Sequence, residues 1–415
     1  MTRIVLTAAC FFLLGAGACV SVQADKTGGG GIEKKELKKE TKAKKEKKEK
    51  VVNVLCYHRF EKMPSKGKGK NWQDTYYLSP EDFEEQMVFL KKNANIISMS
   101  HYVDYLEGKR DIPDKAVVIT IDDGYKSVYT GAFPVLKKYN IPAIVYLYKG
   151  FFPGGRNALS LPEVKEMAEA GIEFGCHSLT HPILTSRRQV KPGHKKRSEL
   201  IDREYIEFLE REVVEAKEYL KNRTGLPIET MAYPYGAYSH EVHHFVKKAG
   251  YRAGFSVVPS YNTKETDKYS LKRTMIFDGD RIEKLERLLA VKPLKVERVY
   301  PADGSIIEER NPQLKAVLAE DAHLNTATIR FRMGTADIKE SVYNLDTKQV
   351  NYYHYKKRIS PGVHIAKVTA EGLAGGFYEY AWLFIVGKRI KQEFLDGEEN
   401  KKSEEVTENG PGEKE

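Results

Sequence analysis

The chain has 415 residues and a formal net charge of +10. It is long enough for two domains and a sizeable core. The apolar stretch at the N-terminus is short for a membrane span, and no other segment has about 18 consecutive apolar residues, so we expect no membrane-spanning helix in the mature protein.

The charge is concentrated at the two ends of the chain. Residues 26–50 hold eleven Lys and five Glu, a contribution of +6, and residues 391–415 hold four Lys and nine acidic residues, a contribution of −5. Both segments are poor in apolar residues, so we predict a Lys-rich disordered linker over 25–50 and an acidic disordered tail over 391–415. The Lys-rich run lacks interleaved aromatic residues, so we expect no nucleic acid partner.

The first residues have the pattern of a secretory signal peptide. A basic start is followed by a short apolar stretch and small residues, and Val22-Gln23-Ala24 offers a cleavage site. We therefore predict a signal peptide over 1–24 and an exported protein, located in the periplasm, the cell envelope or the extracellular space. A lipidated Cys19 is the alternative, and it would tether the chain to a membrane, although no Leu lies three residues before it.

From Val51 onward, short apolar strands alternate with amphipathic helices. Ser79 and Pro80 suit the N-cap and the first position of a helix. Six or seven strands with helical crossovers over about 51–290 predict a parallel barrel or an open α/β sheet. The predicted strands carry the sequences VVNVLCYH, NIISM, AVVITI, AIVYLY, IEFGCH, ETMAYP and RAGFSV.

The pattern changes after Lys292, where alternating strands replace helices. Turn residues separate strands with the sequences TATIRFRM, SVYNL, QVNYYHY, VHIAKVTA and EYAWLFIV. This spacing predicts a small Ig-like β-sandwich domain over 292–390. The region contains no cluster of acidic residues and histidines that would suggest catalysis.

The segment ITIDDGY places Asp122 and Asp123 directly after a strand that reads as fully buried. In parallel α/β proteins, functional sites are built at the carboxyl ends of strands. Two adjacent carboxylates repel each other unless a cation or a proton resolves the conflict. A solvated strand-to-helix turn is the alternative, because Asp-Gly is a common turn pair.

Two more motifs follow predicted strands. His177 and His181 are four residues apart, a spacing that can present both imidazoles to one metal ion, although such pairs also occur by chance. Pro234-Tyr235-Gly236 could form a turn whose backbone N–H binds an oxyanion, or it could be an ordinary turn.

Other polar features suggest no chemistry of their own. Cys56 and Cys176 lie on predicted strands and are expected to be buried free thiols. A basic insertion over 187–197 is interpreted as an exposed loop. A histidine cluster is expected to be solvated at an exposed helix start; it consists of His240, His243 and His244.

Asp-Asp-Gly, His-Ser-x-x-His and Tyr-Pro-Tyr-Gly, in this order, resemble the motifs of the polysaccharide deacetylases of the NodB-homology type (carbohydrate esterase family 4). The likeness also includes LCYHRF, SPEDFEEQMVFLKK and KAVVITIDDGYKSVY, and it covers about 51–290. It is strongest to the branch of poly-N-acetylglucosamine deacetylases. The resemblance implies a distorted (β/α)7-type barrel as the catalytic domain, ahead of the β-sandwich.

The resemblance also implies a division of roles. Asp123, His177 and His181 would hold a divalent metal, commonly zinc, and Asp122 would be the catalytic base. One carboxylate and two imidazoles leave open positions on a metal, which suits a catalytic site. A water bound to the metal would attack the acetyl carbonyl, and the backbone N–H of Tyr235 would stabilise the oxyanion.

Two positions depart from the family pattern. The family often has an Arg where this chain has Ala232, and that Arg pairs with the catalytic Asp. Without it, Asp122 would be either more basic or oriented by another group. The late His that donates a proton in many members is missing from KYSLKRTMIFDGD. His58, or Asp122 itself, is then the candidate general acid, and a His58 packed under the barrel mouth is the alternative.

The predicted function is metal-dependent N-deacetylation of a polysaccharide that contains N-acetylglucosamine. O-acetyl ester hydrolysis at the same site is one alternative. A glycan-binding protein that has lost turnover is another, motivated by the missing Arg and the missing late His.

Overall fold

The structure is a computed structural model. It describes residues 49–62, 76–190, 196–334, 336–352, 358–391 and 393–395. Glu49–Glu415 forms one compact unit. The predicted signal peptide, almost all of the Lys-rich linker and most of the acidic tail lie outside the described residues and stay predictions. No helix in the described part of the chain is both long and apolar enough to cross a bilayer.

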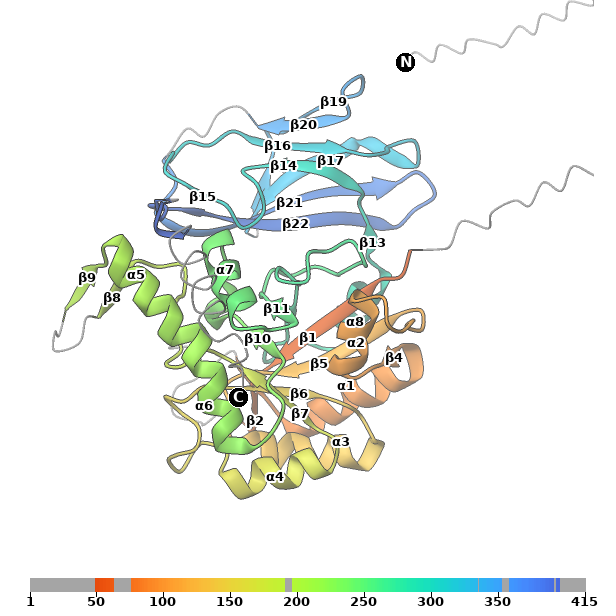
Figure 1. Cartoon of the computed structure of the whole chain (residues 1–415). Helices are drawn as coiled ribbons and strands as arrows, with labels where there is room; N and C mark the ends of the chain where they lie inside the picture. Colours follow the sequence, from red (N-terminus) through yellow and green to blue (C-terminus); the bar gives the residue numbers. More distant parts are fainter. Residues whose placement is uncertain are drawn as a thin grey trace, which may run out of the picture. The chain divides into compact units, whose positions relative to one another are not determined.

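The first half of the compact unit is built around an eight-stranded parallel sheet (Figure 1). The strand order is β11-β10-β7-β6-β5-β1-β12, and β4 pairs with β5 beside this path. The strands are β1 (Val52–Tyr57), β4 (Asn95–Ile96), β5 (Ala116–Ile121), β6 (Ile144–Leu147), β7 (Glu173–Cys176), β10 (Thr230–Ala232), β11 (Ala253–Phe255) and β12 (Thr274–Met275).

The two ends of this sheet are joined by the segment that leads into β12. Leu271 forms an isolated parallel bridge with Phe255 of β11. The backbone N–H of Leu271 donates to the carbonyl of Gly254 at 3.1 Å, and its own carbonyl accepts from Ser256 at 2.8 Å. The sheet therefore curls into a distorted barrel, which confirms the predicted fold class.

Both faces of the central strands are buried, which explains the unbroken apolar run of β5. Val117 and Ile119 belong to a large core cluster that includes residues of the surrounding helices. Val118 faces a second cluster inside the barrel, together with Tyr146 and Phe255. Because side chains alternate along a strand, a strand covered on both sides needs apolar residues at every position.

Helices cover the outside of the sheet, with α1 packed against α3 (Figure 1). The Ser79 hydroxyl accepts a hydrogen bond from the backbone N–H of Asp82 at 3.0 Å, so the predicted N-cap of α1 is confirmed. The helices are α1 (Pro80–Asn93), α2 (Met99–Leu106), α3 (Phe133–Tyr139), α4 (Leu161–Glu169), α5 (Asp202–Leu209), α6 (Ala216–Thr224), α7 (His240–Lys248) and α8 (Ile282–Ala290). Short π or 3-10 turns are η2 (Val128–Ala132), η3 (Glu210–Glu215) and η4 (Pro234–Gly236).

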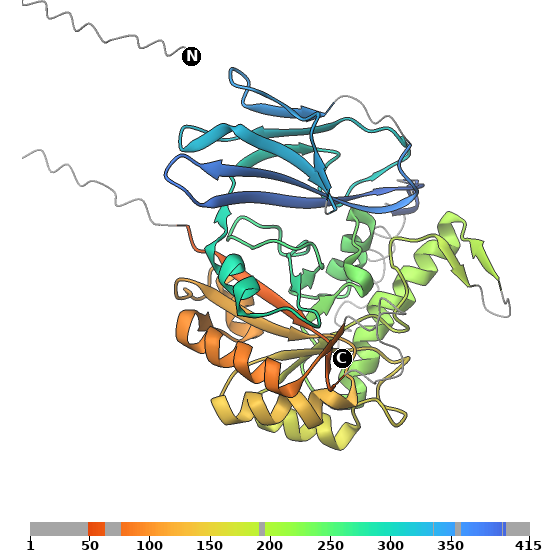
Figure 2. The ribbon, with the colours of Figure 1, turned by 180° about the vertical axis from the view of Figure 1, so that it is seen from behind.

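Two further sheets follow α8 and stack as two layers (Figure 2). One has the order β13-β22-β21-β17-β18 with β15 on β22, and the other has the order β14-β16-β20-β19. Trp382, Phe331 and Phe384 are fully buried in the core that these sheets share. The strands are β13 (Lys292–Pro293), β14 (Val296–Tyr300), β15 (Ile306–Ile307), β16 (Leu314–Leu318), β17 (Leu324–Met333), β18 (Ala336–Ile338), β19 (Val342–Asn344), β20 (Gln349–Tyr352), β21 (Gly362–Gly372) and β22 (Phe377–Val386).

This arrangement is the β-sandwich expected from the alternating pattern. The end of the predicted strand QVNYYHY lies outside the described residues. We propose a boundary between barrel and sandwich at about residue 291, because parallel pairing gives way to mainly antiparallel pairing between α8 and β14.

Two expectations about polar features need revision. His243 is buried because it lies on the side of α7 that faces the core. Its ring centroid is 5.1 Å from that of Tyr238. The basic insertion forms a hairpin of β8 (Arg188–Val190) and β9 (Arg197–Glu199). Its first residue, Arg187, is also buried, where it pairs with Asp202.

Candidate active site

Asp122 and Asp123 lie at the carboxyl end of β5, as predicted. The backbone N–H of Asp122 donates to the carbonyl of Tyr57 at 2.9 Å, so pairing with β1 continues up to this residue. Asp123 has φ 76°, and Gly124 follows with φ 73°. A Cβ on Gly124 would lie 2.4 Å from a methyl group of Leu147, so the turn needs glycine here. Both carboxylates lie near His177, whose Nε2 is 3.8 Å from Asp122 and 3.7 Å from Asp123, so their other partners distinguish the two acids.

Asp122 is held by Arg273, a residue that the sequence analysis did not single out. The Arg273 guanidinium donates to both carboxylate oxygens, at 2.7 and 2.8 Å, and it is fully buried. It also donates to the hydroxyl of Thr120 and to the carbonyl of Ser256. Arg273 therefore supplies the charge that the resemblance led us to expect from an Arg at position 232.

The ion pair with Arg273 keeps Asp122 ionised. Burial by itself raises the pKa of this carboxyl, but the charge of Arg273 outweighs burial and holds the pKa well below its usual range. Of the two alternatives left by Ala232, orientation by another group is the one the structure shows. Asp122 is an ionised carboxylate with a fixed orientation.

Asp123 meets His177 and His181 on the other side of the turn. One carboxylate oxygen of Asp123 lies 3.7 Å from Nε2 of His177 and 3.4 Å from Nε2 of His181, and the two imidazole nitrogens are 3.1 Å apart. The structure therefore brings together the three predicted metal ligands, from the ends of β5 and β7.

The two histidines are oriented by the backbone around them. Nδ1 of His177 donates a hydrogen bond to the carbonyl of Ala232 at 2.7 Å, which leaves the lone pair of Nε2 free to bind a metal. The hydroxyl of Ser178 accepts from the backbone N–H of His181 at 2.9 Å. Ser178 thus braces the histidine loop. Both Ser178 and His181 have left-handed backbone conformations, with φ 67° and 61°, a strain typical of functional sites.

The chemistry of these three groups fits a divalent cation. The Oδ1 atom of Asp123 is buried and has no hydrogen-bond partner among the described residues. Burial and the charge of Asp122 raise the pKa of Asp123 to about 7. Burial lowers the pKa of His177 to about 4 and that of His181 to about 3, so both rings are neutral near pH 7. One carboxylate and two neutral imidazoles are a donor set that zinc accepts.

A second group of metal-ligand atoms lies within reach of Asp122, but it fits a metal poorly. It consists of Cys56, His58 and Asp122. Burial raises the pKa of the Cys56 thiol well above its usual value, so the thiol stays protonated and contacts Asp122 at 3.3 Å. Both oxygens of Asp122 are already bound by Arg273. Asp123, His177 and His181 are therefore the better ligand set.

His58 lines the same cavity as Asp122. Its Nδ1 is buried and has no hydrogen-bond partner in the described part of the chain, and its ring centroid lies 4.5 Å from that of Tyr76. Burial lowers the pKa of His58 to about 4, while Asp122 opposes this shift. His58 is thus a neutral imidazole at the mouth of the barrel.

Tyr235 lies in the tight turn η4, beside the metal-ligand set. It has φ 58°, and its ring centroid is 4.9 Å from that of His181. Gly236 follows with φ 69°, and a Cβ on it would lie 2.4 Å from the backbone nitrogen of Val257. The turn is therefore fixed by close backbone packing, which suits a preorganised donor.

These residues share a cavity of about 390 Å³ at the carboxyl end of the barrel strands. Tyrosines form much of its wall, and the Arg59 guanidinium lies over two of them, 4.0 Å from the ring centroid of Tyr125 and 4.8 Å from that of Tyr77. Aromatic faces suit the apolar faces of sugar rings. The tyrosines in the lining are Tyr76, Tyr77, Tyr125, Tyr148 and Tyr235.

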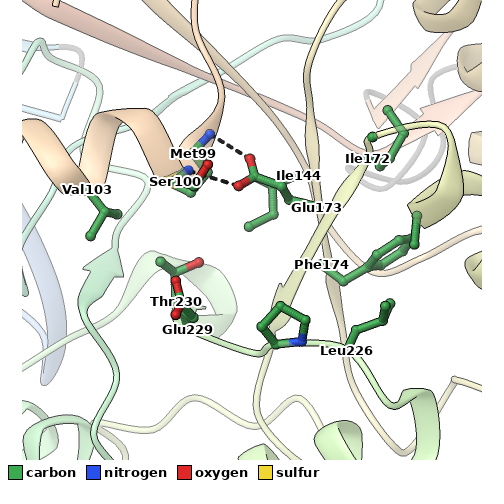
Figure 3. Close-up of a pocket in the computed structure, with 13 residues that line it drawn as sticks. Met99, Ser100, Val103, Ile144, Ile172, Glu173, Phe174, Leu226, Glu229 and Thr230 are labelled. Carbon is green, nitrogen blue, oxygen red and sulfur yellow. Dashed lines mark hydrogen bonds between the residues drawn. The ribbon is translucent and has the colours of Figure 1, made fainter. Parts of the chain in front are cut away.

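A second cavity, of about 320 Å³, lies at the opposite end of the strands (Figure 3). There the carboxylate of Glu173 accepts from the backbone N–H groups of Met99 and Ser100, at 2.7 and 2.9 Å, and thereby caps α2 (Figure 3). Glu229 pairs with Arg252. Both acids are thus engaged in structural contacts, and no histidine or cysteine lines this cavity.

Three comparisons with known proteins agree with this geometry. The family model "Polysaccharide deacetylase" matches residues 109–254, a range that contains Asp122, His177 and Tyr235 but neither His58 nor Arg273. A poly-beta-1,6-N-acetyl-D-glucosamine N-deacetylase of Staphylococcus aureus is 30% identical over 210 residues, which are 49% of this chain and 69% of the relative. The Staphylococcus epidermidis protein of the same name is 28% identical over 244 residues, 56% of this chain and 81% of the relative.

The fold has a solved counterpart. The Streptococcus pyogenes deacetylase PplD in complex with acetate has a TM-score of 0.50 and 23% identity, and the match covers 58% of this chain and 99% of that one. Barrel, site and relatives together define a hydrolase that removes acetyl groups. The chain belongs to the polysaccharide deacetylase family, in the branch of the poly-N-acetylglucosamine enzymes.

Proposed function

We propose that the chain is a metal-dependent N-deacetylase of a polysaccharide that contains N-acetylglucosamine. The observation that carries this proposal is the difference between the two adjacent acids. Asp123 lies near both imidazoles and has an oxygen without a hydrogen-bond partner among the described residues. Asp122 also lies 3.8 Å from His177, but a buried guanidinium binds both of its oxygens. The names of the staphylococcal relatives support the substrate class.

Asp123, His177 and His181 would hold the metal, and zinc suits their nitrogen and oxygen donors. When bound there, a divalent ion lowers the pKa of a water molecule and polarises the acetyl carbonyl. Asp123 has to be ionised for this, and the cation itself favours its ionised form.

Asp122 would remove a proton from the attacking water. The bidentate contact with Arg273 leaves Asp122 ionised near pH 7 and fixes the direction of its lone pairs. Its low pKa makes it a weak base by itself, so it depends on a water that the metal has made more acidic.

The remaining roles fall to His58 and Tyr235. The backbone N–H of Tyr235, held in place by the turn around Gly236, would donate to the oxyanion that develops on the acetyl carbonyl oxygen. His58 lines the cavity close to Asp122 and is neutral at rest, so it would first take up the proton that Asp122 removes from the water and then pass it to the leaving amine. Direct return of that proton by Asp122 is the alternative.

The substrate would lie across the tyrosine wall, where its sugar rings can stack.

We also propose that the chain is exported, on the basis of the N-terminal pattern. A membrane tether is expected only if Cys19 is lipidated, and no nucleic acid partner is expected. Hydrolysis of O-acetyl esters would use the same groups. Assays on N-acetylated and on O-acetylated polymers distinguish the two activities. The missing Arg no longer supports the binding-only alternative, because Arg273 pairs with Asp122 in its place. The missing late His is the argument that remains for it.

Acetate release from β-1,6-linked N-acetylglucosamine oligomers tests the proposal. The wild-type protein is expected to release acetate, and a chelator is expected to stop it. Asp122→Asn should lower kcat by about 10²–10⁴-fold while metal content stays unchanged. Asp114→Asn is the matched control, because this exposed residue precedes the other end of β5. Unchanged turnover in Asp122→Asn would contradict the proposed mechanism. Glycan binding without any acetate release would favour the binding-only alternative.

A further inference from the structure

The turn that follows β14 contacts the barrel through a carboxylate, that of Asp303. Its Oδ2 accepts from the Lys272 ammonium at 2.7 Å, and its Oδ1 accepts from the hydroxyl of Tyr238. Lys272 also donates to the hydroxyl of Tyr238 at 2.9 Å. Leu383 of β22 donates its backbone N–H to the same Oδ1 at 3.1 Å, so the carboxylate is fixed to the sandwich as well.

Both barrel partners adjoin catalytic groups. Lys272 directly precedes Arg273, and the two side chains leave the extended chain in different directions, one toward Asp303 and the other toward Asp122. Tyr238 comes two residues after Gly236, the residue that fixes the turn around Tyr235. Two segments are therefore joined at one carboxylate; we call residues 271–275 the Arg273 segment and residues 233–238 the oxyanion segment.

Further contacts make this junction rigid. The side-chain amide of Asn262 binds Lys272 at both backbone groups, accepting from its N–H at 2.7 Å and donating to its carbonyl at 2.9 Å. The carbonyl of Gly304 accepts from the backbone N–H of His240 at 3.1 Å, and a Cβ on Gly304 would lie 3.2 Å from the ring of Tyr238. The turn of the sandwich thus lies directly against the barrel.

We propose that Asp303 is a positioning residue for the deacetylation reaction, and that one role of the β-sandwich is to hold the Arg273 segment and the oxyanion segment in register. The proposal rests on the proposed function of the site. Asp303 touches no reacting atom and acts through Lys272 and Tyr238.

Because Lys272 is buried, its position depends strongly on the contact with Asp303. The Lys272 side chain is 6% exposed, and an ammonium at this depth needs a charged acceptor. Without the carboxylate of Asp303, the ammonium has to move toward water. Since Arg273 is the next residue, that movement also displaces the guanidinium that orients Asp122.

Asp303→Asn tests the proposal, because it removes the charge and keeps the shape. We expect kcat on an N-acetylglucosamine oligomer to fall about ten-fold while KM changes less than about two-fold. Glu241→Gln is the matched control: the Glu241 carboxylate accepts from the backbone N–H of Ile390, so the change removes one charge from another contact between barrel and sandwich. This control should keep wild-type kcat.

A double-mutant cycle separates positioning from a general loss of stability. In an Arg273→Lys background, Asp303→Asn should lower kcat by less than about two-fold more, because both changes act on the same group. Independent ten-fold losses would overturn the proposal. Equal losses in Asp303→Asn and Glu241→Gln, or an unchanged kcat in Asp303→Asn, would do the same.

Amide hydrogen exchange gives a readout that does not need turnover. Asp303→Asn should lower protection in residues 233–238 and 271–275, and Glu241→Gln should not. If the wild-type protein releases no acetate from any polymer, the proposed function fails, and exchange alone decides whether Asp303 holds these segments. Unchanged exchange in Asp303→Asn would then overturn the inference.

Discussion

Arg273 and Asp122 form a bidentate ion pair inside the barrel, although 151 residues separate them in the chain. Arg273 lies where the two ends of the curled sheet meet, between the bridge at Leu271 and strand β12, and its guanidinium reaches Asp122 at the end of the interior strand β5. Closure of the barrel and orientation of the proposed base therefore depend on the same short segment.

Arg273→Lys should preserve the positive charge but lose the fork that binds both oxygens of Asp122. We expect kcat to fall by about 10–100-fold with little change in metal content, because the carboxylate is no longer held in one orientation. Steady-state kinetics and metal analysis of the purified variant measure this. Arg273→Met is predicted to unfold more readily, by about 3–5 kcal/mol in urea titration, since it leaves a buried carboxylate unpaired. Full activity in Arg273→Lys would contradict the role assigned to the pair.

Replacing both His177 and His181 with Ala should abolish stoichiometric zinc binding. Asp123 alone then remains of the three ligands that the structure brings together. Elemental analysis after dialysis against zinc measures the result. The control is His101→Ala, a histidine of α2 at the other end of the barrel. Retention of one zinc per chain in the double variant would refute the ligand assignment.

Gly236→Ala should damage the turn that presents the N–H of Tyr235. The new Cβ would lie 2.2–2.4 Å from atoms of Val257, so the backbone has to shift, and a shift of about 1 Å can cost about 100-fold in kcat. Gly279→Ala is the matched control: Gly279 also has a positive φ, of 81°, but no atom lies within 4 Å of its added Cβ. Gly279→Ala should lose about 1 kcal/mol of stability because of its positive φ, and Gly236→Ala should lose more because of the clash with Val257. The loss of turnover should be confined to Gly236→Ala.

His243 should make the protein less stable in acid. Burial lowers its pKa to about 4, against about 6.5 in the unfolded chain. Between these values the unfolded state binds more protons, so this contribution to stability is complete above about pH 6.5 and is lost as the pH falls toward 4. Between pH 7 and pH 4.5 the free energy of unfolding, measured in urea, should fall in both proteins, but by about 2–3 kcal/mol less in His243→Phe than in the wild type. Parallel pH profiles for the two proteins would show that His243 does not titrate this way.

The sequence predicted much of the fold and the proximity of Asp123, His177 and His181, because the signals are local. The apolar run of β5, the cap at Ser79 and the order of the three motifs each depend on neighbouring residues. Parallel strands place their carboxyl ends at one edge of the sheet, so motifs at strand ends meet there once the fold class is known. The resemblance to the deacetylase family grouped Asp123, His177 and His181 as ligands, and this geometry is compatible with that grouping.

Arg273, Asp303 and the burial of His243 could not be predicted in the same way. Arg273 reads as one cation in a short polar stretch, and only the curling of the sheet brings its guanidinium to Asp122. Lys272 and Asp303 pair only because the sandwich packs against the barrel. The sequence by itself thus determined which acids and histidines follow the strands, since that is a matter of local pattern. The tertiary structure decided which charge each acid faces, since that depends on contacts between residues far apart in the chain.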